Sequence, residues 1–69
     1  MNIKDLAHVD SVITACKNEK GNMIGIPVFE SMKLYEGEYY AKLIGYNNIF
    51  GEPVGEDIVK RIEQRMILH

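Results

Sequence analysis

The chain has 69 residues, of which 46% are hydrophobic and 26% charged, and its formal net charge is -2 at pH 7. This composition is typical of a folded globular protein, and the length is that of a single domain covering residues 1–69. The negative charge excludes a bulk electrostatic attraction to nucleic acid or to an anionic membrane. The N-terminus lacks a signal-peptide pattern, and no apolar run approaches the roughly 18 residues of a transmembrane helix. We therefore expect a soluble cytoplasmic protein.

A chain of this length buries a small core, so disulfides, a metal ion or self-association often add stability. Cys16 is the only cysteine, which excludes an intramolecular disulfide. Cys16, His8 and His69 do not form a tetrahedral metal set with normal spacing. By elimination, the sequence predicts a homodimer or larger homo-oligomer with no metal and no cofactor.

The N-terminal segment has two readings. Asn2 can cap a short helix over residues 3–9. The β-branched run at 12–14 then favours a strand over residues 11–17. Because the apolar residues of this segment also keep near-helical spacing, the alternative continues the helix through Cys16.

A turn is predicted at residues 18–21, where Asn opens and Gly closes the segment, as in many hairpin loops. The resulting first hairpin pairs Cys16 with Ile24 and is apolar on both faces, so both faces require cover. Pro27 cannot donate to a sheet ladder, which predicts an edge position for the second strand. Gly25 indicates a bulge or a close neighbour.

A second hairpin is predicted from strands at 31–35 and 38–46 joined by a turn at Glu36-Gly37. The predicted register pairs Tyr35 with Glu38, Leu34 with Tyr39, Lys33 with Tyr40 and Met32 with Ala41. A slip of one residue would move the lysines into the core, so this register is well specified. The face predicted to be buried consists of Met32, Leu34, Tyr39, Ala41 and Leu43, and the opposite face of Lys33, Tyr35, Glu38, Tyr40 and Lys42.

A C-terminal helix is predicted from Glu56, with acidic residues in its first turn and basic residues toward its end. Its apolar face consists of Ile58, Val59, Ile62 and Met66. Phe50 and Val54, in the preceding loop, are expected to tuck under this helix. The sequence thus predicts an α+β fold, in which a small antiparallel sheet of about four strands in two hairpins packs against the C-terminal helix. The short N-terminal helix completes it, and strand order stays open.

The sequence contains no pattern typical of a catalytic site. Cys16 is predicted to be a small core residue, because no base is oriented beside it. The carboxylate pairs flank a turn or begin a helix, and no phosphate-binding loop is present. The densest basic group is Lys60, Arg61 and Arg65, which on a helix could contact phosphates. Ion pairs of Glu56 with Lys60 and of Asp57 with Arg61 favour a role in helix solubility instead. We therefore predict that the protein is not an enzyme.

Tyrosines and lysines alternate on the outer face of the central hairpin, and this is the candidate binding surface. It consists of Tyr35, Tyr40, Tyr46, Lys33 and Lys42. Exposed tyrosine is common on strands and is also favoured at protein contacts. The first hypothesis is a small regulatory or accessory module, such as a phage-type inhibitor, that binds another protein. The alternative is binding of single-stranded nucleic acid by base stacking and phosphate contacts, although the order of residues matches no RNA-binding signature.

Overall fold

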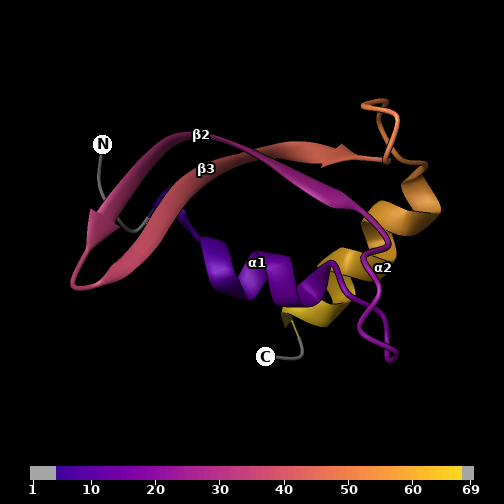
Figure 1. Ribbon diagram of the computed structural model, residues 1–69, viewed down its shortest axis with the longest axis horizontal. Coiled ribbons are helices and arrows are strands. Elements are labelled where there is room, and N and C mark those ends of the chain that lie inside the picture. The colour runs from indigo at the N-terminus through magenta and orange to yellow at the C-terminus, as the bar shows by residue number, and fades with distance from the viewer. Residues whose placement is uncertain (1–4, 68–69) are drawn as a thin grey trace.

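The computed structural model describes residues 5–67 and confirms an α+β fold with an antiparallel sheet and two helices (Figure 1). The sheet has three strands in the order β1-β3-β2, and α1 and α2 lie on the same side of it. The elements are β1 (Ala7–His8), α1 (Val9–Ala15), β2 (Ile26–Tyr35), β3 (Glu38–Asn47) and α2 (Glu56–Ile67). None of the helices in this described range is long and apolar enough to cross a membrane.

The strand over residues 11–17 was a wrong prediction, because α1 continues to Ala15 and Cys16 is its C-cap. The helical alternative is therefore correct for residues 9–15. The helix predicted over 3–9 is wrong where the structure describes it, because Ala7–His8 form β1 and α1 begins only at Val9, and residues 3–4 lie outside the described range. A strand would have exposed apolar groups on both faces. The helix instead gathers Val9, Val12 and Ala15 on its buried side, while Asp10, Ser11 and Thr14 are exposed and Ile13 is half-buried. Tertiary burial therefore outweighs the β-branched propensity of this run.

The turn at residues 18–21 is confirmed. The Gly21 N–H donates to the Asn18 carbonyl at 2.9 Å, and the Ile24 N–H donates to the Cys16 carbonyl at 2.7 Å. The predicted pairing of Cys16 with Ile24 therefore holds at the base of this turn. It extends no further, since α1 ends just before Cys16, and residues 5–67 contain three strands rather than about four.

The predicted third strand is the second half of a single long strand, β2. Glu30 pairs with Lys42 and Lys33 pairs with Tyr40, which leaves two residues of β2 opposite Ala41. Ser31, one of these two, has a φ of 56°, in the left-handed region. This bulge replaces the simple pairing of Met32 with Ala41 that the sequence predicted. As Pro27 indicated, β2 lies at an edge of the sheet.

The turn of the central hairpin and the register next to it are confirmed. Glu36 and Gly37 have φ values of 49° and 82°, as a two-residue turn with two left-handed positions requires. The pairs closest to the turn are Tyr35 with Glu38, Leu34 with Tyr39, and Lys33 with Tyr40.

The apolar side chains near this turn are not buried, contrary to expectation. Leu34 is 64% exposed and Tyr39 51%, whereas Ala41 is fully buried. Figure 1 shows the reason: the turn of the β2–β3 hairpin extends past the beginning of α1, beyond the cover of either helix. We call residues 32–41 the hairpin arm.

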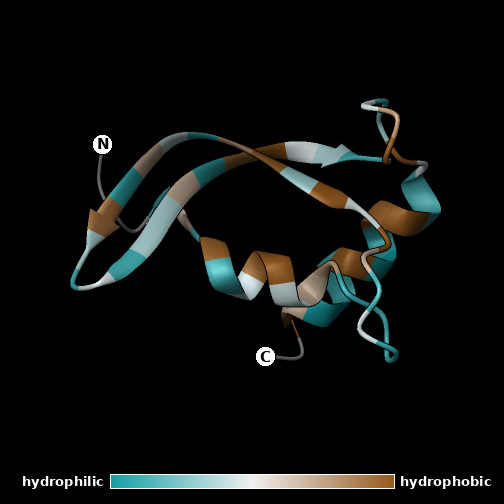
Figure 2. Cartoon of the chain, in the orientation of Figure 1, coloured by the Kyte–Doolittle hydropathy of each residue, from teal (hydrophilic) through white to brown (hydrophobic). Residues whose placement is uncertain are grey.

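The core lies between the sheet and the two helices. Each helix carries both hydrophobic and hydrophilic residues around its circumference (Figure 2). A Cβ placed on Gly25 would come within 3.0 Å of Ile62 Cδ1, so the predicted close neighbour of Gly25 is confirmed. The buried core cluster consists of Val12, Ala15, Cys16, Tyr46 and Ile62.

The C-terminal helix is confirmed as α2, with its predicted apolar residues packed on the core. Val54 also packs on the core, whereas Phe50 is 79% exposed, so its predicted position under the helix is wrong. The expected ion pairs from the acidic first turn to Lys60 and Arg61 do not form. Within residues 5–67, the only ion pair within 4.0 Å apart from the His8–Glu38 contact joins Lys42 and Glu30, and neither contact involves α2.

Candidate functional site: the aromatic face of the hairpin arm

Three aromatic rings meet on the outer face of the hairpin arm. The Tyr35 and Tyr40 rings have centroids 6.3 Å apart and planes at 73°, an edge-to-face contact. The His8 ring lies 5.3 Å from Tyr40, because β1 pairs with β3 so that His8 is directly opposite Tyr40. The sequence placed the two tyrosines together through the hairpin register. It gave no signal for His8, whose position depends on the long-range pairing of β1.

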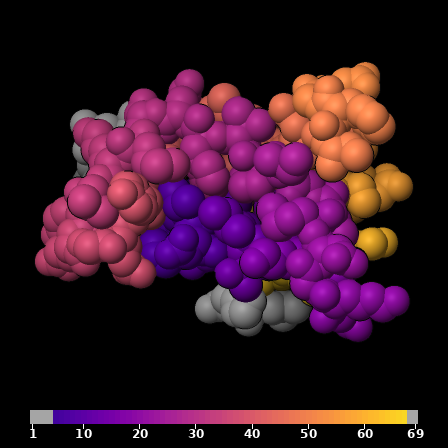
Figure 3. Space-filling view, viewed as in Figure 1, coloured from indigo at the N-terminus to yellow at the C-terminus, as the bar shows by residue number. Residues whose placement is uncertain are grey.

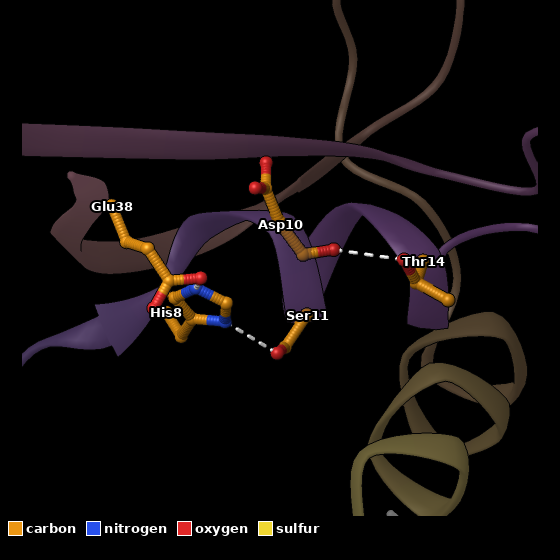
Figure 4. Close-up of polar contacts among 5 residues, drawn as sticks. All are labelled: His8, Asp10, Ser11, Thr14 and Glu38. Atoms are coloured by element: carbon orange, nitrogen blue, oxygen red, sulfur yellow. Dashed lines mark hydrogen bonds and ion pairs between the residues drawn. The ribbon is translucent and has the colours of Figure 1, made fainter.

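His8 links three segments through hydrogen bonds at both ring nitrogens (Figure 4). Its Nε2 lies 2.9 Å from Glu38 Oε1, and its Nδ1 lies 2.6 Å from Ser11 Oγ. A neutral imidazole satisfies both contacts by donating from Nε2 and accepting the hydroxyl hydrogen of Ser11 at Nδ1. These hydrogen bonds link the start of α1 to the end of the arm. This structural role explains why His8, Ser11 and Glu38 lie together.

Asp10 brings a second carboxylate close to His8 and Glu38. The possible ligand atoms of these three side chains all lie within 4.8 Å of one another, and imidazole with carboxylate is a donor set that Zn²⁺ and Mn²⁺ accept. The sequence missed this group because Glu38 is distant along the chain. The hydrogen bond between His8 and Glu38 already explains their proximity, and Asp10 is exposed, so no metal function follows from the cluster.

The charges on the outer face are balanced. Lys42 Nζ lies 3.6 Å from Glu30 Oε1, and Glu38 lies beside the His8 ring. Lys33 lies on the same face, opposite Tyr40. The two lysines of the face, Lys33 and Lys42, are therefore equal in number to its two glutamates, Glu30 and Glu38. This face therefore lacks the excess of positive charge that a nucleic-acid backbone attracts.

Tyr46 lies apart from the two other predicted tyrosines, because a bulge leaves Ile44 unpaired and turns Tyr46 to the same side of β3 as Leu43. It is only 7% exposed and belongs to the core cluster beside Cys16. Burial raises the pKa of the Tyr46 phenol, and the charges of Cys16 and Glu63 raise it further. Because its ring is enclosed, we leave Tyr46 out of the proposed contact surface.

In the proposed contact surface, Leu34, Tyr39 and Met32 replace Tyr46. On the face opposite the three rings, Leu34 is 64% exposed and Tyr39 51%, and Met32 at the bulge is 52% exposed. The sequence contained these residues but assigned them to the core. The arm thus presents large apolar or aromatic groups on both of its faces.

Comparison of the chain with protein families, with curated proteins and with solved structures finds no match in any of the three.

Proposed function

We propose that this protein is a non-enzymatic binding module that contacts another protein through the hairpin arm. The observation that carries the proposal is the exposure of large side chains on a projecting two-stranded element. Leu34, Met32, Tyr39 and Tyr35 are between 64% and 49% exposed and are close together along two paired strands. Clustered exposed apolar and aromatic groups of this kind are typical of protein contact sites.

The geometry favours a protein partner over single-stranded nucleic acid. Base stacking needs an open ring face, whereas the Tyr40 ring is half-buried between His8 and Tyr35. Lys42 is paired with Glu30, so its charge is partly compensated before any phosphate approaches. A protein surface requires neither free ring faces nor a net positive field.

The same surface supports self-association as one form of this contact. A chain of 69 residues has a small core, and the exposed arm residues would gain cover from a second copy. A regulatory or accessory role, such as inhibition of a larger enzyme, needs only a surface that docks on that enzyme. Self-association and docking on a larger enzyme both belong to the proposed function, because both require the hairpin arm.

The test compares two doubly substituted variants by sedimentation and by capture of partners from host-cell extract. Leu34→Ser with Tyr39→Ser removes apolar groups from the arm. Ile49→Ser with Phe50→Ser is the matched control, because these side chains are 82% and 79% exposed but lie in the loop before α2. We expect the arm variant alone to lose self-association or partner capture. Equal behaviour of the two variants would reject the arm as the contact surface.

Binding of single-stranded nucleic acid remains the second candidate, supported by the alternation of Tyr35, Tyr40, Lys33 and Lys42 on one face. An amide-resolved NMR titration with mixed-sequence single-stranded DNA and RNA tests it. Shifts at these residues that weaken with salt, and that Tyr40→Ala and Lys42→Ala abolish, would favour this candidate. Parent-like binding by both variants would reject it.

A further inference from the structure

A hollow of about 650 Å³ lies between the turn after α1 and the second half of α2. It shares no residue with the hairpin arm, and it is largely open to solvent rather than an enclosed pocket. The lining contains three basic side chains, three amide side chains and one carboxylate, which are Lys20, Arg61, Arg65, Asn18, Asn22, Gln64 and Glu19.

Two separate elements hold the basic groups in place. Arg61 and Arg65 are one helical turn apart on α2, so they project from the same side of the helix. Lys20 lies in a closed turn, where Asn18 Oδ1 accepts hydrogen bonds from the backbone N–H groups of Lys20 at 2.9 Å and Asn22 at 3.0 Å. The turn lies beside α2 (Figure 1), at the opposite end of the molecule from the arm (Figure 3). The three cations are therefore gathered by tertiary structure rather than by one helix face.

The positive charge of this hollow is not compensated within the described residues. None of its three basic side chains has a carboxylate oxygen within 4.0 Å among residues 5–67, even though Asp57 precedes Arg61 by one turn. Three cations line the hollow against one carboxylate, from Glu19. The helix dipole favours Arg65 near the end of α2, but it does not explain a lysine brought there by another segment.

We propose that this hollow binds the phosphate groups of a small phosphorylated molecule. Arginine guanidinium groups match phosphate oxygens with paired hydrogen bonds, and the ammonium of Lys20 adds a point charge. Asn22 in the turn and Gln64 on α2 also line the hollow and provide neutral N–H donors. Because no aromatic side chain of residues 5–67 lines the hollow, these residues offer phosphate recognition without a stacking surface for a base. This site is independent of the hairpin arm and of the function proposed for it.

The test is an amide-resolved NMR titration with inorganic pyrophosphate at constant ionic strength, with sodium chloride as the reference salt. We expect saturable shifts at residues 18–22 and 61–65 and none at the arm. Arg61→Gln should weaken pyrophosphate binding about tenfold, as loss of a charge-assisted hydrogen-bond pair does. Lys60→Gln is the matched control, because it removes the same charge from the neighbouring exposed position outside the hollow.

Three outcomes would overturn the proposal: no saturable shifts, shifts equally produced by chloride, or equal weakening by Arg61→Gln and Lys60→Gln. Arg61 is exposed, so its substitution is not expected to unfold α2, and circular dichroism checks this. A parallel titration with adenosine diphosphate separates the sources of phosphate. Binding equal to that of pyrophosphate supports a phosphorylated metabolite as ligand, whereas binding of pyrophosphate alone supports the free inorganic anion.

Discussion

Tyr35 and Tyr40 pack edge to face, with their ring centroids 6.3 Å apart. They lie on adjacent strands, and Tyr40 also contacts His8, so Tyr40 has an aromatic neighbour on each side. Tyr35 is 49% exposed, while Tyr40 is half-buried. Tyr40 therefore supports the arm, and Tyr35 is the more accessible of the two to a partner.

This relationship predicts different effects for Tyr35→Ala and Tyr40→Ala. We expect Tyr40→Ala to lower the free energy of unfolding more, because it removes contacts with both His8 and Tyr35. The coupling energy of the pair, from a double-mutant cycle in urea denaturation, should be about 0.5–1.5 kcal/mol. Additive effects would show that the two rings do not stabilise each other in solution.

Gly25→Ala should destabilise the fold. The added Cβ would lie 3.0 Å from Ile62 Cδ1, and Ile62 is fully buried at the centre of the core. We expect a loss of about 1–3 kcal/mol in the free energy of unfolding, the usual range for overpacking. Gly45→Ala is the control, because no atom lies within 4 Å of its added Cβ and alanine costs less backbone entropy than glycine. Equal losses for the two substitutions would contradict the contact with Ile62.

Glu36→Asn should stabilise the hairpin arm. Glu36 has a φ of 49° and precedes Gly37 in the turn, and asparagine tolerates this left-handed conformation better than glutamate. We expect a gain of about 0.5 kcal/mol in the free energy of unfolding, since the Asn-Gly pair is the preferred sequence of this turn. Urea denaturation measures it, and Glu38→Asn, outside the turn, should give no gain.

Cys16 should react slowly with thiol reagents. Because of this residue, the free energy of unfolding should also decrease at alkaline pH. Burial raises the pKa of its thiol from the ordinary value of 9.0, and its side chain is fully enclosed. The unfolded thiol ionises first as the pH rises, so its contribution to stability is complete below pH 9.0 and decreases above it. Tyr46, whose pKa is also raised by burial, adds the same trend at higher pH.

Urea denaturation at about pH 7.5 and about pH 9.5 measures this loss of stability. Cys16→Ala should show a smaller difference between the two conditions, because the ionising thiol is absent. Rapid labelling of the folded protein near neutral pH, at the rate of an unfolded peptide, would contradict the burial of Cys16.

The local sequence was sufficient to predict those elements for which the turn residues and the pattern of apolar side chains indicate the same structure. The turn at Glu36-Gly37, the register beside it and the apolar face of α2 depend on neighbouring residues, so they could be predicted. The burial of Cys16 was predictable for the same reason. The strand predicted over residues 11–17 failed because β-branched propensity competes with helical burial, and only packing against the sheet decides between them.

The candidate sites depended on tertiary structure to a greater degree. The sequence alone identified Tyr35 and Tyr40 as neighbours, because hairpin pairing is a local property. The exposure of Leu34 and Tyr39 follows from how far the helices extend over the sheet. The contact of His8 with Tyr40 follows from the pairing of β1 with β3, and the burial of Tyr46 from the bulge that leaves Ile44 unpaired. A residue pattern specifies which face of a strand is apolar, but long-range packing decides which part of that face is covered.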